Sequence, residues 1–312
     1  MSTKLKLLTS TLALAMAGSM ITAAKAEELW DPYLRGVFEG LPAGALPPPG
    51  VYGELDNYYA AYSYFNAAGD KVPGTHMNVL VEVPIVLWVP DIKILGATYG
   101  AAIAQPFDYN TYQPLQNNTR GGGGNLGIYN TVLLPVILSW SLPEHFFVRT
   151  GFGVYLNDAT NTPADLVDGK LSNGGVPSGN GYSTIQPDLG FSWLYDGWNV
   201  SVGTHYEFPV GSTTTTNYNY RSAPEFAADY TVAKTIGAWT MGVGAEQEDQ
   251  FTKDTFNGQP VPGSIVHNYG IGPIVGYQLR GGVGVTAIWN HHFATSSDVA
   301  GDFFNIRLTT AF

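Results

Sequence analysis

The 312-residue chain contains no cysteine, so no disulfide bond supports its fold. This absence is compatible with export, because outer-membrane proteins need no disulfides. Charged residues are also scarce, at 12% of the chain against ~25% in typical soluble proteins. Aromatic residues, in contrast, make up 13% of the chain. A chain of this composition must form either an unusually large core or a surface that faces lipid.

Long apolar runs are missing after the N-terminus. The longest candidate, Val79–Val89, is interrupted by Glu82 and Pro84 and is shorter than the ~18–20 residues of a transmembrane helix. Basic residues are few as well. Three of the 14 Lys and Arg residues lie in the first 26 positions, which leaves 11 against 25 acidic residues, a net charge near −14. This charge argues against nucleic acid, whose binding needs Lys and Arg to neutralise phosphates.

The N-terminus has the pattern of a secretory signal peptide. Two lysines precede an apolar run from Leu7 to about Ala23, and the tripeptide ending at Ala26 has the small-x-small form of a cleavage site. We therefore assign residues 1–26 to a signal peptide rather than to a buried N-terminal helix. The mature chain is then expected to begin near Glu27.

The last ten residues, FFNIRLTTAF, separate into two faces at alternate positions. One face holds Phe304, Ile306, Leu308, Thr310 and Phe312, and the other holds Asn305, Arg307, Thr309 and Ala311. A period of two is typical of a β-strand between two different environments. The end of the chain is therefore expected to be part of the wall of the structure, although the ends of most soluble domains are loosely held.

About twelve such segments predict an all-β fold. They are 51–65, 75–89, 92–105, 126–142, 145–156, 184–196, 197–210, 224–235, 238–249, 264–279, 282–294 and 303–312. Tight turns between them alternate in strict order with longer polar linkers, at 66–74, 106–125, 157–183, 211–223, 250–263 and 295–302. An antiparallel up-and-down transmembrane β-barrel has this order, with short periplasmic turns and longer external loops, whereas a β-sandwich mixes connection lengths. We therefore expect residues 51–312 to form an outer-membrane barrel.

Tryptophans near the proposed short turns support the barrel. Trp140, Trp198 and Trp239 each lie within a few residues of such a turn, as expected for a girdle where lipid meets water. Trp88 also lies near a short turn, but it has the same parity as Glu82, so its direction stays open.

Closure of the barrel explains the end of the chain. Backbone groups in hydrocarbon must be paired within the protein, so the last strand is expected to pair with the first. Phe312 would then face lipid. A terminal aromatic residue after alternating apolar residues also resembles the signal that outer-membrane assembly machinery reads.

Several blocks of the sequence resemble a known family. They are AGALPPPGVY, DKVPGTHMNV, VLLPVILSWSLPEHFFVRTGFGVY, NYRSAPEFAADYTV and FFNIRLTTAF. In this order they are similar to the outer-membrane proteins grouped as the phenol-degradation meta-pathway family, across nearly all of the mature chain. The resemblance implies a β-barrel and a channel for hydrophobic or aromatic compounds. It supplies no functional residues that can be carried over position by position.

Titratable residues on the polar faces of the predicted strands are candidates for the lining of the lumen. They are Glu82, Arg149, Asp188, His205, Glu207, Glu225, Asp229, Glu246, His292 and Arg307. One interpretation is an acidic constriction that favours cations and neutral solutes over anions. The other is a packed network in which Arg149 and Arg307 pair with carboxylates. The two roles can coexist.

Two segments leave alternatives open. Residues 27–50 contain apolar residues followed by PPPG, which neither continues a helix nor joins a ladder. They form either a plug in the periplasmic mouth or a disordered lead-in. The polar loop 157–183 either folds inward over the pore or stays at the surface.

Other chemistries find little support. His291 and His292 point to opposite faces of a strand and cannot readily share one metal ion. The glycine run at 121–124 lacks the Lys-Ser/Thr of a phosphate loop, and no flanking pattern nominates a catalytic nucleophile. We therefore expect a monomeric channel for small solutes, with no cofactor. A closed-lumen surface barrel is the alternative, and an outer-membrane hydrolase is the third hypothesis.

Overall fold

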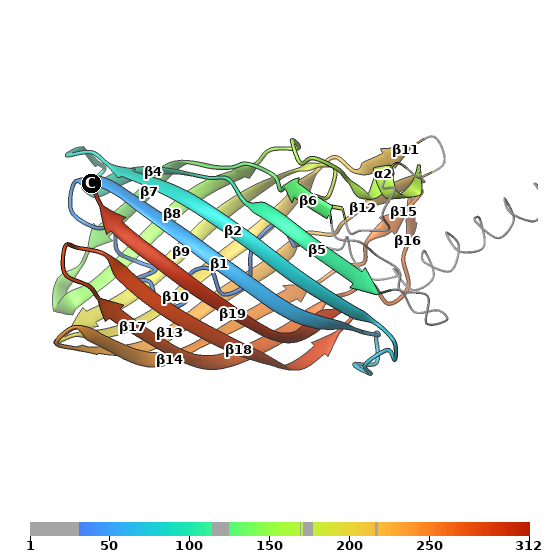
Figure 1. Ribbon diagram of the computed structural model, residues 1–312. Helices are drawn as coiled ribbons and strands as arrows, with labels where there is room; N and C mark the ends of the chain where they lie inside the picture. The colour runs from blue at the N-terminus through green and yellow to red at the C-terminus, as the bar shows by residue number, and fades with distance from the viewer. Residues whose placement is uncertain (1–30, 114–124, 169, 171–176, 216–217) are drawn as a thin grey trace, which may run out of the picture.

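The computed structural model describes residues 31–113, 125–168, 170, 177–215 and 218–312. They form a closed antiparallel β-barrel of 12 strands, inclined to the barrel axis (Figure 1). The predicted signal peptide and the glycine run at 121–124 lie outside these residues. Within the described ranges, no helix is long and apolar enough to cross a membrane.

Two of the wall positions are each shared by two shorter strands. β4 and β5 both pair with β2, while β6 pairs with β5 and β7 pairs with β4. The break between β4 and β5 falls at Gln105 and Pro106, because proline cannot donate to a ladder. The wall strands are β1 (Gly50–Phe65), β2 (His76–Val89), β4 (Ala97–Ala104), β5 (Phe107–Gln113), β6 (Asn125–Ile128), β7 (Val132–Ser141), β8 (Phe146–Tyr155), β9 (Ser183–Tyr195), β10 (Trp198–Val210), β13 (Glu225–Ile236), β14 (Trp239–Gln250), β17 (His267–Gln278), β18 (Gly284–Ser296) and β19 (Asp298–Ala311).

The predicted closure of the last strand on the first is confirmed. β1 and β19 pair along their lengths, from Tyr52 opposite Ala311 to Phe65 opposite Asp298. The backbone N–H of Phe312 continues this pairing by donating to the carbonyl of Val51 over 2.9 Å. The side chain of Phe312 is 84% exposed, at the end of the barrel that holds the short turns (Figure 1).

Some predicted linkers are strands instead. Residues 106–125 include β5 and the first residue of β6, and the linkers at 211–223 and 250–263 contribute β11 (Thr213–Thr215), β12 (Tyr218–Arg221), β15 (Thr255–Phe256) and β16 (Gln259–Pro260). These four form a small separate sheet at the loop end of the barrel, near α2 (Pro163–Val167) (Figure 1). Near the short turns, β3 (Lys93–Ile94) pairs with β4, and η1 (Pro143–His145) joins β7 to β8.

The strict alternation of short and long connections is wrong at one position. β18 ends at Ser296 and β19 begins at Asp298, so the predicted linker at 295–302 is a tight turn around Ser297. Polar residues suggested a linker there, but they have partners inside the barrel mouth. Thr295 donates to Asn268 over 2.9 Å, and Asn268 donates to Asp298 over 2.5 Å.

The outer surface of the barrel is apolar. Exposed apolar side chains include Leu80, Val86, Trp88, Phe191, Val200, Val232, Trp239, Val243, Ile271, Val275, Trp289 and Phe304. Trp88 is 50% exposed, which settles its direction as outward. Near the short turns, the rings of Trp239 and Tyr277 pack edge to face at 4.6 Å. A closed barrel with this outer surface belongs in a lipid bilayer, so the chain is an outer-membrane protein.

The interior has two chemically different sides. The inner faces of β1, β2, β4 and β7 form the apolar wall, whose buried residues include Tyr58, Tyr62, Val79, Val81, Val83, Ala104 and Val132. The inner faces of β9, β10, β13, β14, β17, β18 and β19 form the polar wall. Its buried residues include Asp188, Ser192, His205, Asp229, Glu246, Asn290 and Arg307. This asymmetry determines what each side of the lumen can bind.

Candidate functional site

Residues 31–49, called the lumen segment below, run through the barrel interior before β1 begins (Figure 1). The first part is a chain of tight turns, in which the N–H groups of Val37 and Glu39 donate to the carbonyls three residues before them, each over 3.1 Å. Gly36 and Gly40 have φ values of 74° and 82°, a backbone region that side chains disfavour. The segment therefore uses glycine to stay compact inside the lumen.

Asp229 on β13 is the main hydrogen-bond acceptor for the lumen segment. Its carboxylate accepts from the N–H of Gly36 over 3.1 Å, from the N–H of Phe38 over 2.8 Å and from the hydroxyl of Tyr33 over 2.5 Å. The ring of Tyr33 also stacks on the imidazole of His205, with centroids 4.1 Å apart. One buried carboxylate on the polar wall thus binds three residues of the segment.

Arg307 on β19 links the lumen segment to β1, the strand that pairs with β19 and closes the barrel. Its guanidinium donates to the carbonyl of Glu39 over 2.6 Å and to that of Val37 over 2.5 Å. The same group pairs with Asp56 at 3.0 Å and with Glu54 at 3.2 Å, both on β1. The predicted pairing of Arg307 with carboxylates is therefore present, and it holds the segment as well as the wall.

Arg35 makes the reverse connection, from the segment to the wall. It pairs with Asp298 at 2.6 Å, with Glu248 and with Asp31. The carboxylates of Asp31, Glu225 and Glu248 lie within 4.8 Å of one another, a grouping that resembles a metal site. The guanidinium of Arg35 supplies the positive charge in this cluster.

The last part of the lumen segment lies directly on the backbone of the wall. The N–H of Gly44 donates to the hydroxyl of Ser192, and the hydroxyl of Ser139 donates to the carbonyl of Gly44, both over 2.8 Å. A β-carbon at Gly190 would overlap the carbonyl of Ala43. Glycine at position 190 is thus required for this close approach.

All but one of the predicted lumen residues have buried side chains on inner faces. These are Arg149, Asp188, His205, Glu207, Glu225, Asp229, Glu246, His292 and Arg307. Glu82 is the exception, because it shares the exposed face of β2 with Leu80 and Val86, and its predicted position in the lumen is wrong. The error arises because β2 turns its apolar residues, such as Val81 and Val83, toward the interior.

The buried histidines are paired with carboxylates of the polar wall. His205 lies 2.7 Å from Asp188, and His292 lies 3.0 Å from Glu246. His291 is exposed on the opposite face of β18, as the parity argument requires. Arg149, in contrast, joins no ion pair within the described part of the chain, so its predicted pairing with a carboxylate is absent.

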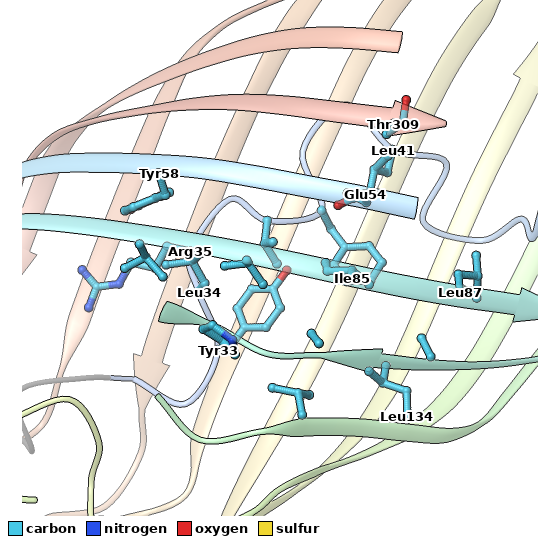
Figure 2. A pocket seen from close by; sticks show the side chains of 18 of the residues that line it. Tyr33, Leu34, Arg35, Leu41, Glu54, Tyr58, Ile85, Leu87, Leu134 and Thr309 are labelled. Atoms are coloured by element: carbon cyan, nitrogen blue, oxygen red, sulfur yellow. The ribbon is translucent and has the colours of Figure 1, made fainter. Parts of the chain in front are cut away.

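A cavity of about 710 Å³ remains between the lumen segment and the apolar wall. Figure 2 shows Leu34 and Leu41 of the segment, Ile85 and Leu87 of β2 and Leu134 of β7 around this space. The lining extends along the barrel. Near the short turns it includes Leu87, Gly282 and Thr310, and in the half nearer the loops it includes Asp108, Asn110 and Ser178.

Ser178 belongs to the loop whose position the sequence left open. Residues 178 and 180 of this loop are buried, and Asn130 donates to the carbonyl of Tyr182 over 3.1 Å. The described residues 177–182 therefore fold inward. The residues at 171–176 lie outside the described part.

The sequence analysis does not identify the residues of the apolar wall, because it assigns only the polar faces of the strands to the lumen. In β2 both faces are largely apolar, with Val79, Val81 and Val83 inside and Leu80 and Val86 outside. A strand whose residues are apolar at both odd and even positions thus indicates an apolar inner face. The partners of the lumen segment had no such local signal.

Comparisons with known proteins agree with this architecture. The sequence profile of the family described as "Putative MetA-pathway of phenol degradation" matches residues 63–308. The fold is similar to that of the COG4313 outer membrane channel from Pseudomonas putida F1, with a TM-score of 0.73 and 12% identity, over 86% of this chain and 98% of that one. No curated protein sequence matches the chain.

Two other barrels are more distant. The translocator domain of the autotransporter NalP from Neisseria meningitidis has a TM-score of 0.48 and 11% identity, over 97% of this chain and 98% of that one. The TodX monoaromatic hydrocarbon channel has a TM-score of 0.46 and 10% identity, over 86% and 91% of the two chains. At these scores neither adds to the functional argument.

Proposed function

Since this chain belongs to the family described by the MetA-pathway of phenol degradation, and its barrel encloses an apolar cavity, we propose that it is an outer-membrane channel for passive uptake of small apolar or aromatic solutes. The observation that carries the proposal is the cavity between the lumen segment and the apolar wall. Apolar ligands need a concave apolar site with a few polar groups, and this cavity meets that requirement.

The two sides of the lumen then have different tasks. The polar wall holds the lumen segment through groups such as Asp229 and Arg307, so these residues support the plug more than they filter solutes. We infer that residues 27–50 act as this plug, on the support of the contacts made by residues 31–49. The solute path lies on the apolar side, where Val83 and Leu87 line the cavity.

We also propose that the chain is a monomer without enzymatic activity. The buried Asp229, the His205–Asp188 pair and the His292–Glu246 pair belong to the polar wall that surrounds the lumen segment, which supports a structural role for them. The exposed Phe312 at the end of β19 is proposed to be read by the outer-membrane assembly machinery, and lipid surrounds the barrel.

Liposome swelling and planar-bilayer measurements with the purified protein test the proposal. Val83→Trp narrows the cavity from the inner face of β2, and we expect it to lower permeation of a toluene-sized solute by about tenfold. Val86→Trp, on the outer face of the same strand, is the matched control and should leave permeation unchanged. A wild-type protein that passes no small solute would favour the closed-lumen barrel instead.

A further inference from the structure

Arg149 differs from the other arginines of the barrel interior. Arg35 and Arg307 each pair with two or more carboxylates, whereas Arg149 joins no ion pair and donates no hydrogen bond to any described residue. Its side chain is only 6% exposed and lines the cavity. The contact that holds it is a cation–π interaction, with the guanidinium 4.6 Å from the centre of the Phe38 ring.

The carboxylates around the cavity have other partners, and one oxygen of Asp188, Oδ2, accepts no hydrogen bond from the described residues. Asp188 interacts with Arg149 electrostatically but lies beyond ion-pair distance. Its Oδ1 atom instead contacts Nδ1 of His205 and accepts from Nε2 of Gln186, both at 2.7 Å. Asp31 pairs with Arg35, and Glu54 pairs with Arg307. Asp108 on β5, which also lines the cavity, forms no ion pair with Arg149 and accepts from Asn110 over 2.5 Å.

The inner face of β8 carries no second charged side chain after this guanidinium, and Arg149 and Tyr155 both line the cavity. Gly151 and Gly153 follow Arg149 on the same face, and Tyr155 closes the row. The two glycines present no side chain of their own, and the side chains of Asp188 and Gln186 from β9 lie against them, 3.1 Å and 3.6 Å from the positions of their missing β-carbons. The hydroxyl of Tyr155 donates to Gln186 over 2.8 Å, which fixes the ring.

An unpaired, buried guanidinium is costly, because burial removes its water without supplying a counter-ion. Intramembrane charges are retained mainly where they serve a ligand or an ion. A guanidinium presents parallel N–H donors that match the two oxygens of a carboxylate, and such charge-assisted pairs are among the strongest hydrogen bonds in proteins. Arg149 is therefore suited to an anionic ligand group.

We propose that Arg149 is the anchor for the carboxylate of an amphipathic solute, whose apolar ring or chain lies against the apolar wall. This inference rests on the proposed channel function and specifies its solute class as apolar carboxylates. It reverses the expectation that an acidic interior favours cations and neutral solutes, because the lumenal acids are occupied by the plug and its supports. Phe38 of the lumen segment then positions Arg149 and shields one side of its guanidinium.

Two measurements test the inference. Titration calorimetry measures benzoate binding to the purified protein in detergent, and planar-bilayer recordings measure whether benzoate blocks the current. Arg149→Gln should weaken benzoate binding by at least about tenfold. Arg149→Lys should weaken it less, because the lysine ammonium keeps the positive charge but lacks the parallel N–H donors of a guanidinium. Arg280→Gln, in an exposed short turn, removes the same charge and should change nothing. Octanoate should also bind, while acetate should bind much more weakly because it has no apolar part.

Benzyl alcohol is the neutral analogue that separates the outcomes. Its permeation should be equal in wild type and Arg280→Gln, and Arg149→Gln should change it far less than it changes benzoate binding, because benzyl alcohol has no carboxylate to lose its anchor. Benzoate binding that is unaffected by Arg149→Gln would overturn the inference, as would parallel loss of benzyl alcohol permeation, which indicates a structural role for Arg149. If wild type passes benzyl alcohol but does not bind benzoate, only this inference fails. If wild type neither passes benzyl alcohol nor binds benzoate, the proposed channel function fails.

Discussion

Tyr33 and Asp229 lie 196 residues apart in the chain and share a 2.5 Å hydrogen bond inside the barrel. The same carboxylate accepts from the N–H groups of Gly36 and Phe38, so it organises the turns of the lumen segment. Because these partners are buried, the carboxylate cannot be exchanged for water without loss of order in the segment.

Asp229→Ala should therefore loosen the lumen segment. It leaves two backbone donors and one hydroxyl without an acceptor, and we expect a loss of about 2–4 kcal/mol in unfolding free energy with noisier single-channel current. Tyr33→Phe removes one bond and should cost about 1 kcal/mol. Urea unfolding and bilayer recordings measure the two effects, and equal effects of both variants would contradict the central role of Asp229.

Deletion of residues 30–49 should enlarge the path through the barrel. Without the segment, the polar wall faces an open lumen, and we expect conductance to rise several-fold, with selectivity for cations because the remaining lining is acidic. Planar-bilayer recordings give both quantities. Unchanged conductance would show that the segment does not restrict the path.

Gly190→Val should displace the end of the lumen segment by a local clash. A side chain at this position overlaps the carbonyl of Ala43, so the variant should approach the deletion in conductance. Gly153→Ala is the matched control, because a β-carbon there would lie 3.6 Å from the nearest atoms of Gln186, an ordinary contact. Conductance that rises equally in both variants would argue against a specific contact with Ala43.

Glu82→Leu should stabilise the barrel in a bilayer. The carboxylate lies on the outer face between Leu80 and Val86, and its removal from a lipid-facing position should add about 1–2 kcal/mol to the unfolding free energy. Unfolding from lipid vesicles measures this gain. Conductance should stay unchanged, and a change in conductance would show that Glu82 acts on the solute path.

Phe312→Ala tests the proposed signal at the end of β19. The backbone pairing of residue 312 with Val51 is retained, so the purified protein should refold in detergent like wild type. Its assembly in the outer membrane of living cells should fall, as measured by the folded fraction in membrane extracts. Normal assembly of the variant would indicate that the terminal aromatic ring is not read.

Most of the barrel wall could be predicted from the local alternation of apolar and polar residues in the sequence. In β10, β13, β14, β17 and β19 one face is apolar and the other polar, so parity alone predicted which side chains are buried, among them Asp229, Glu246 and Arg307. The same rule failed for Glu82, because β2 carries apolar residues on both faces. The prediction of a linker at 295–302 is also wrong, because polar residues that lie in a barrel mouth have the same composition as a loop.

The sequence by itself determined the class of the protein: a period of two, repeated from segment to segment, leaves a sheet no stable form in lipid other than a closed barrel. What the lumen contains was decided only by the tertiary structure. The lumen segment has no periodic pattern, and its partners, such as Gly36 and Asp229, are 193 residues apart. Their contact exists only after closure of the barrel brings the polar wall around the segment. The same closure leaves Arg149 unpaired, beside the apolar cavity.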